Sequence, residues 1–148
     1  MTVCELLKRA RQKFNKWQRP MAFEEPIKDL RTLNETVAKL KIPEHEFTNS
    51  SYLKQHERAD WTGALMDLQR FINGMYWECR KRGFPIYVHT IWRDPATQLK
   101  LYREGNSKLK SGAHQRSAAA DILHPDWHWD LPEHGWDYMG IIGKEVAR

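Results

Sequence analysis

The chain has 148 residues, a net charge of +5 and 41% hydrophobic residues, which suits one soluble domain with a modest core. Two cysteines, Cys4 and Cys79, are too few for a disulfide framework, so we expect free thiols. No apolar run approaches the roughly 20 residues of a membrane span, and no signal-peptide hydrophobic stretch precedes the first charges. We therefore expect a protein that is made in the cytoplasm without a signal peptide.

The first 20 residues predict a basic amphipathic helix that ends at Pro20. Its apolar residues recur at helical spacing from Val3 to Trp17. The helix either packs on the core with a solvated basic face or docks onto an anionic partner, for which cell-wall polymers, nucleic acid and acidic proteins all qualify. Seven tryptophans add candidate anchors for a protein partner. We predict a basic helical arm over residues 1–50 and a second domain over 51–148.

The middle of the chain predicts two core helices separated by a loop. The first carries apolar residues from Ile27 to Leu40 and ends before Pro43, and residues 43–51 are expected to form the loop. The second has its apolar stripe from Trp61 to Cys79 and ends in basic residues followed by Gly83. Both stripes predict core packing, not contact with a cofactor.

A strand followed by a helix is predicted next. The β-branched and aromatic run 86–92 is typical of a strand, while Asp94 and Pro95 suit the N-cap and first turn of a helix. Arg93 lies at the junction, where its guanidinium can bind a carboxylate or a developing oxyanion through paired hydrogen bonds. Gln98 follows within the first turns of the helix.

His114 and Asp121 are candidate zinc ligands. On one straight helix their side chains would lie about 10 Å apart along the axis, so sharing an ion requires the chain to turn between them. Gly112, Ser117 and the alanines of 118–120 are small enough to allow that turn. The alternative is an alanine-rich helix start with a solvated histidine and a surface aspartate.

These segments together resemble the zinc D,D-carboxypeptidase and L-alanyl-D-glutamate peptidase family, the VanY-like peptidoglycan hydrolases that include phage endolysins. Residues 111–122 are similar to its S-x-H-x-x-G-x-A-x-D signature, with Ser117 in place of the glycine and Ser111 one position farther from His114 than usual. Arg93 and Gln98 match a Y-R-x-x-x-x-Q element, with Trp92 replacing the tyrosine. The resemblance implies His114 and Asp121 as ligands of one zinc ion, with Arg93 and Gln98 at the catalytic site.

Residues 136–146 have apolar side chains at helical spacing and resemble the W-x-x-I-G helix of the same family. The family continues into a D-x-x-H or E-x-W-H element that supplies the third zinc ligand and the catalytic carboxylate. The chain ends at Arg148, so we expect a C-terminally truncated domain or a rewired site. The local candidates are His128 and His134 as third ligand, and Asp126, Asp130 and Glu133 as acid or base.

The expected fold is α+β, with helices packed on a small antiparallel sheet whose cleft carries Arg93, His114 and Asp121. One function follows from the resemblance: a phage-related zinc peptidase that hydrolyses peptidoglycan stem peptides and is delivered to the cell wall. The alternative is a catalytically inactive, peptidase-derived structural or interaction protein, such as a component of the phage particle.

Overall fold

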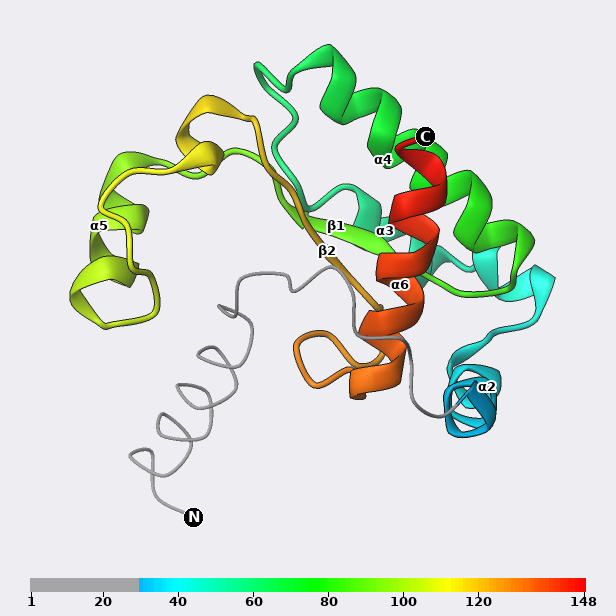
Figure 1. Ribbon diagram of the computed structural model, residues 1–148. Coiled ribbons are helices and arrows are strands. Elements are labelled where there is room, and N and C mark those ends of the chain that lie inside the picture. Colours follow the sequence, from blue (N-terminus) through cyan, green and yellow to red (C-terminus); the bar gives the residue numbers. More distant parts are fainter. Residues whose placement is uncertain (1–29) are drawn as a thin grey trace. The chain divides into compact units, whose positions relative to one another are not determined.

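A computed structural model describes residues 30–148 (Figure 1). These residues fall into two compact units, one formed by residues 94–112 and the other by residues 30–93 with 113–148. The predicted basic helix and Cys4 lie outside the described residues. The elements in chain order are α2 (Leu30–Leu40), η1 (Glu44–Thr48), α3 (Ser50–His56), α4 (Met66–Lys81), β1 (Tyr87–Thr90), α5 (Pro95–Arg103), η2 (Ala113–Arg116), β2 (Asp121–Leu123) and α6 (Glu133–Val146).

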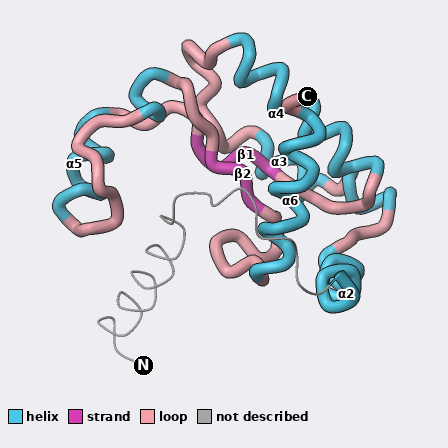
Figure 2. Tube along the Cα trace, in the orientation of Figure 1, coloured by secondary structure: helices cyan, strands magenta, loops and turns pink. Residues whose placement is uncertain are grey.

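Strands β1 and β2 form a two-stranded antiparallel sheet, which confirms the predicted α+β class (Figure 2). Val88 pairs with Ile122, but the next pair is Thr90 with Asp121, so β1 contains one extra residue, His89, at this point. An extra residue of this kind forms a β-bulge, which redirects the side chains beside it. The β-bulge therefore lies directly opposite Asp121, one of the two predicted zinc ligands.

One hydrophobic core cluster lies between α4 and one face of this sheet. Ile72 of α4 and Val88 of β1 are fully buried together with Ile91. Burial of such side chains contributes roughly 1.5 to 3 kcal/mol each.

The predicted apolar positions Ile72, Met75 and Cys79 form the buried face of α4, and Cys79 is a free thiol. The predicted stripe began too early, because the chain turns before the helix: Trp61 and Leu65 precede α4, and Leu65 is exposed.

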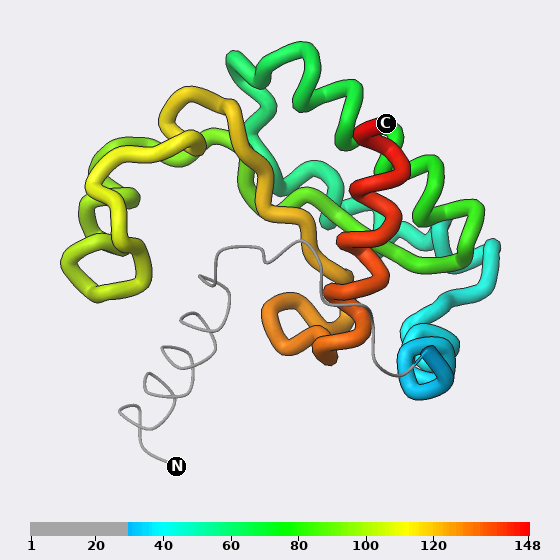
Figure 3. The backbone as a smooth tube through the Cα atoms, in the orientation of Figure 1, coloured from blue at the N-terminus to red at the C-terminus, as the bar shows by residue number. Residues whose placement is uncertain are grey.

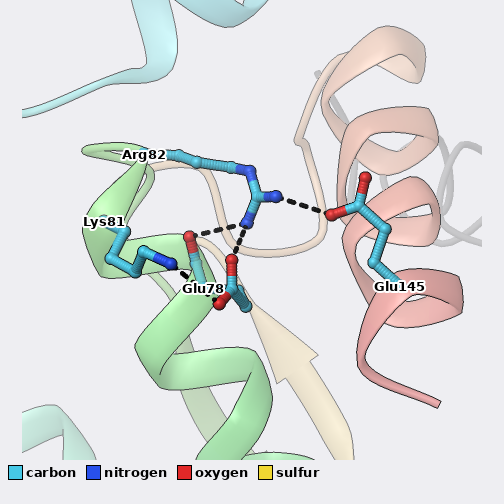
Figure 4. A network of polar contacts seen from close by, with 4 residues as sticks. All are labelled: Glu78, Lys81, Arg82 and Glu145. Atoms are coloured by element: carbon cyan, nitrogen blue, oxygen red, sulfur yellow. Dashed lines mark hydrogen bonds and ion pairs between the residues drawn. The ribbon is translucent and has the colours of Figure 1, made fainter. Parts of the chain in front are cut away.

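Helix α6 contacts both α2 and α4, and the tube in Figure 3 follows its course beside α4. At the C-terminal end of α4, Arg82 bonds the carboxylate of Glu78 on its own helix and that of Glu145 on α6, the latter at 2.6 Å (Figure 4). Lys81 also contacts Glu78, at 3.1 Å. One guanidinium thus joins the ends of two helices.

Residues 30–50, which the predicted boundary at residue 50 assigns to the arm, pack within the larger unit. Helix α2 contacts α6, and the amide of Ile42 donates to the carbonyl oxygen of Gly83 at 2.9 Å. The predicted loop 43–51 contains η1 and the start of α3, where the Asn49 side chain accepts from the Ser51 amide as an N-cap. The prediction missed both short helices.

Helix α5 begins as predicted. The Asp94 side chain accepts from the Thr97 amide at 2.9 Å, and Pro95 occupies the first turn. Among the helices of residues 30–148, none is both long enough and apolar enough to cross a membrane.

Candidate functional site

His114 is held in a fixed orientation by the segment that follows β1. It lies in η2, and its ring Nδ1 is 2.9 Å from the carbonyl oxygen of Ile91. A carbonyl can only accept, so Nδ1 carries the proton and, in the neutral ring, Nε2 presents its lone pair. The backbone N–H of Arg93 donates to the carbonyl oxygen of His114 at 3.2 Å, which ties the two segments together. This is the arrangement in which a histidine can bind a metal through Nε2.

Ser117 makes the turn between His114 and Asp121. Its φ of 50° is left-handed, a conformation that favours glycine, and Ser117 stands where the resembled pattern has a glycine. Its buried hydroxyl donates to the carbonyl oxygen of Thr62 at 2.9 Å, which compensates for the backbone conformation. The chain therefore turns as the spacing of the two candidate ligands requires.

Asp121 is the first residue of β2, and its carboxylate contacts two side chains from outside the strand. Oδ2 accepts from Nη2 of Arg93 at 3.0 Å, and Oδ1 lies 3.4 Å from Nε2 of His114. All three side chains are largely shielded from solvent, with exposures of 18 to 23%. The contact with Asp121 raises the pKa of His114 against the opposing effect of burial. The structure thus brings three of the predicted site residues, Arg93, His114 and Asp121, into one cluster.

The spacing within this cluster suits a shared metal ion. Zinc binds nitrogen and carboxylate oxygen at about 2.0 to 2.2 Å, so two tetrahedral ligands lie about 3.3 to 3.6 Å apart. The 3.4 Å between His114 Nε2 and Asp121 Oδ1 falls in that range. The Ile91 carbonyl and the Arg93 guanidinium occupy the positions from which supporting groups orient metal ligands. The same geometry also describes an ion-paired triad without metal when His114 is protonated.

A third ligand does not join them. Within residues 30–148, no group of three His, Cys, Asp or Glu side chains is arranged to hold a metal ion. His128 has its Nδ1 2.8 Å from the Tyr87 hydroxyl, and His134 has its Nδ1 3.2 Å from Asp137 on α6. Two candidate ligands, His114 and Asp121, lie together, and both predicted candidates for the third are engaged through Nδ1.

The candidate acids flank a tight turn after β2. The turn is closed by the His128 amide, which donates to the carbonyl oxygen of His124 at 2.9 Å, and His128 itself has a left-handed φ of 47°. Asp126 is exposed within this turn, Asp130 is exposed just after it, and Glu133 is exposed at the start of α6. None of these three carboxylates forms a three-donor group with other described residues.

Gln98 has a clear role within its own unit. It is only 4% exposed, and its amide nitrogen donates to the Ser107 hydroxyl at 2.9 Å and to the Leu109 carbonyl oxygen at 2.6 Å. These bonds fix the loop after α5. The predicted participation of Gln98 in catalysis remains a prediction.

A second group of polar side chains on β1 was not predicted from the sequence. The Tyr87 hydroxyl lies 3.4 Å from His89 Nδ1 and 2.8 Å from His128 Nδ1. Burial lowers the pKa of His89, Arg58 and His128 lower it further, and Asp121 opposes them. Because the charge of Asp121 acts on His89, the polar group of Tyr87, His89 and His128 is electrostatically connected to the cluster of His114 and Asp121. The alternation of β1 signalled only that Tyr87 and His89 share a face.

No family model, no curated protein and no solved structure matches this chain.

Proposed function

We propose that the protein is a zinc-dependent peptidase of the peptidoglycan hydrolase type, with His114 and Asp121 as two ligands of one ion. The observation that carries the proposal is the 3.4 Å separation of His114 Nε2 and Asp121 Oδ1, combined with the hydrogen bond from His114 Nδ1 to Ile91. A bound zinc ion would polarise the scissile carbonyl and activate water for attack at neutral pH.

His128 is the better supported of the two candidate third ligands. Tyr87 on β1 binds its Nδ1, which leaves Nε2 as the donor atom, and β1 is the strand that pairs with Asp121. The partner of His134 is instead Asp137 of its own helix. We therefore expect His128→Ala to weaken zinc binding strongly and His134→Ala to leave it within about threefold.

Arg93 orients Asp121 in this proposal. Its guanidinium donates to Oδ2 of Asp121, and its positive charge would also stabilise a substrate carboxylate or the developing oxyanion. The substrate that the resemblance implies is a peptidoglycan stem peptide. A phage-related origin, with release during lysis or carriage in the particle, is consistent with that substrate and belongs to the same proposal.

Zinc content and peptide release test the function together. The protein is loaded with zinc, freed of excess metal and assayed for metal and for new amino groups released from purified peptidoglycan. We expect about one equivalent of zinc and hydrolysis that a chelator abolishes and added zinc restores. His114→Ala should lose both, whereas His45→Ala, an exposed histidine in η1, should lose neither. A protein that stays metal-free and inactive in excess zinc would contradict the proposal.

The second candidate is an inactive, peptidase-derived interaction protein. It is favoured by the pairing of Asp121 with both Arg93 and His114 and by the lack of a three-donor group among residues 30–148. In that case His114→Ala would lower the free energy of unfolding, and neither metal content nor peptide release would respond.

A further inference from the structure

We propose that the end of α5 and the loop that follows it bind the surface of an anionic lipid bilayer, with Leu109 inserted among the headgroups. The surface consists of Tyr102, Arg103, Lys108, Leu109 and Lys110, which we call the basic tip. All five residues belong to the smaller compact unit. The inference goes beyond the proposed function, because it uses no residue of the His114 cluster.

The loop after α5 turns back along the helix and is held there by hydrogen bonds (Figure 1). Gly105 has a left-handed φ of 74°, which ends the helix, and the Ser107 amide donates to the carbonyl oxygen of Leu101 at 3.1 Å. The buried Gln98 amide donates to the Ser107 hydroxyl at 2.9 Å and to the Leu109 carbonyl oxygen at 2.6 Å. The backbone that carries the basic tip is therefore fixed before any partner binds.

The basic tip exposes an aliphatic side chain between two ammonium groups. Leu109 is 60% exposed, and Lys108 and Lys110 on either side of it are exposed as well. At the boundary between headgroups and acyl chains, Leu109 would leave water while the lysines keep their charges among the lipid phosphates. Tyr102 is also exposed, and its ring with a polar hydroxyl suits the same depth.

The positive charge of the basic tip has no local counterpart. Glu104 is the single acidic residue between positions 95 and 112, and its carboxylate lies 4.0 Å from Nζ of Lys100. Within residues 30–148, no carboxylate lies within ion-pair distance of Arg103, Lys108 or Lys110. Three cations thus face solvent, and each basic side chain at an anionic bilayer strengthens binding about fivefold.

The side chains of the basic tip favour lipid over single-stranded nucleic acid. Proteins that bind single strands offer aromatic faces on which successive bases stack. Tyr102 is the one aromatic residue of the tip, and Nζ of Lys110 lies over its ring, 5.5 Å from the centroid. Leu109 offers no surface for stacking, whereas a bilayer accepts an aliphatic side chain at its interface.

Vesicle binding by the full chain tests the surface. Vesicles of phosphatidylglycerol and phosphatidylcholine in equal parts should bind the protein at least about tenfold more tightly than phosphatidylcholine alone. Lys108→Ala and Lys110→Ala together should lower the partition constant about 25-fold, and Leu109→Ser should lower it about fivefold. As a matched control, Lys39→Ala with Lys54→Ala removes two exposed lysines of the larger unit and should change it less than about threefold.

A fluorescent label close to Leu109 reports the contact locally. It is attached to Ser111→Cys in a chain that also carries Cys4→Ser, because Cys79 is buried. Its emission should shift to the blue on anionic vesicles and be quenched by a lipid with a quencher in the headgroup. The same label on Ser50→Cys, an exposed position of α3, should show neither effect. This readout separates contact through the basic tip from binding by other basic segments, and thermal unfolding verifies that each variant is folded.

Three results would overturn the inference. Vesicle affinity of the variant with both Lys108→Ala and Lys110→Ala within about threefold of the native chain would remove the lysines from the contact. Unchanged emission of the label at position 111 on vesicle-bound protein would place the contact elsewhere. Binding of a single-stranded oligonucleotide without binding of anionic vesicles would assign the surface to nucleic acid instead. None of these results changes the expected zinc content or peptide release, so the proposed function is tested separately.

Discussion

The guanidinium Nη2 of Arg93 lies 3.0 Å from Oδ2 of Asp121, although 28 positions separate them in the chain. The contact leaves Oδ1 of the same carboxylate facing His114. Arg93 thereby selects which carboxylate oxygen is presented to His114. We regard this as its main structural contribution to the site.

Arg93→Ala tests that contribution. Without the guanidinium the Asp121 carboxylate can rotate, so zinc affinity should fall about 10- to 100-fold, as for other supporting contacts of metal ligands. Zinc titration against a competing chelator measures the effect. Arg31→Ala, which removes an exposed partner of Glu35, should leave affinity unchanged. Equal zinc affinity in native and Arg93→Ala protein would exclude this role for Arg93.

Two glycines of α6 should respond in opposite directions to alanine. A Cβ on Gly135 would lie 2.8 Å from Leu131 Cγ and 2.9 Å from Leu40 Cδ1, so Gly135→Ala should destabilise the fold by about 1 to 3 kcal/mol. Gly140 is exposed, and a Cβ there would meet nothing within 4 Å, so Gly140→Ala should stabilise by about 0.5 to 1 kcal/mol. Urea unfolding compares the pair, and a stabilising Gly135→Ala would contradict the packing of α6 against α2.

The contact of Arg82 with Glu145 should be measurable as a coupling between α4 and α6. Because the pair is partly exposed, a double-mutant cycle with alanine at both positions should give about 0.5 to 1 kcal/mol. Arg82→Ala alone should cost more than Glu145→Ala, since it also removes the bond to Glu78. The exposed pair of Arg31 and Glu35 is the matched control, with an expected coupling below about 0.5 kcal/mol. Additive effects of the Arg82 and Glu145 substitutions would rule out the coupling.

Acidification should destabilise the protein through His124. Its buried ring lies with Nε2 2.9 Å from the Leu40 carbonyl oxygen, and Nδ1 accepts from the Asp126 amide, so the neutral form is the one that fits. Burial lowers its pKa, so as pH falls below about 6.5 the unfolded chain takes up the proton first. The free energy of unfolding should therefore fall with pH there, by at most about 1.4 kcal/mol per pH unit for this group.

His56, His89 and His114 also contribute to the expected pH profile. Burial lowers the pKa of His56 and that of His89, which gives both the same sign as His124. The pKa of His114 is raised, so its contribution is present at low pH and is lost as pH rises through the folded-state value. Imidazole titration by NMR should show His124 and His56 below the ordinary pKa and His114 above it. An ordinary value for His124 would refute the assignment of its buried neutral state.

The sequence predicted those elements whose signals are local. Asp94 and Pro95 mark the start of α5, and the later apolar positions Ile72, Met75 and Cys79 coincide with the buried face of α4. The short helices η1 and α3 were missed because their few residues carry no full apolar period, although Asn49 before two serines is a capping signal. β1 ends before its predicted limit because the Trp92 amide bonds the Asp60 carbonyl oxygen instead of β2.

The part of the site that could be predicted from the sequence depends on the spacing of His114 and Asp121, which requires a turn between them. His114, Asp121 and Arg93 were named from residue type and order, and the left-handed Ser117 lies between the first two. His89 escaped notice because its position depends on pairing with β2, which no local pattern encodes. His128 was named for its chemistry, while its contact with Tyr87 spans 41 positions.

Strand β1 has one residue more than β2 across the bulge, and this extra residue makes the length of β1 a functional constraint. Removing one residue between Val88 and Thr90 would preserve every apolar side chain of the core while restoring a regular ladder. His89, which now stands opposite Asp121, would then be gone, and the Tyr87 hydroxyl would lose its contact with the His89 ring. A homologue with a strand one residue shorter would therefore be expected to keep this fold and to have a different chemistry at its sheet.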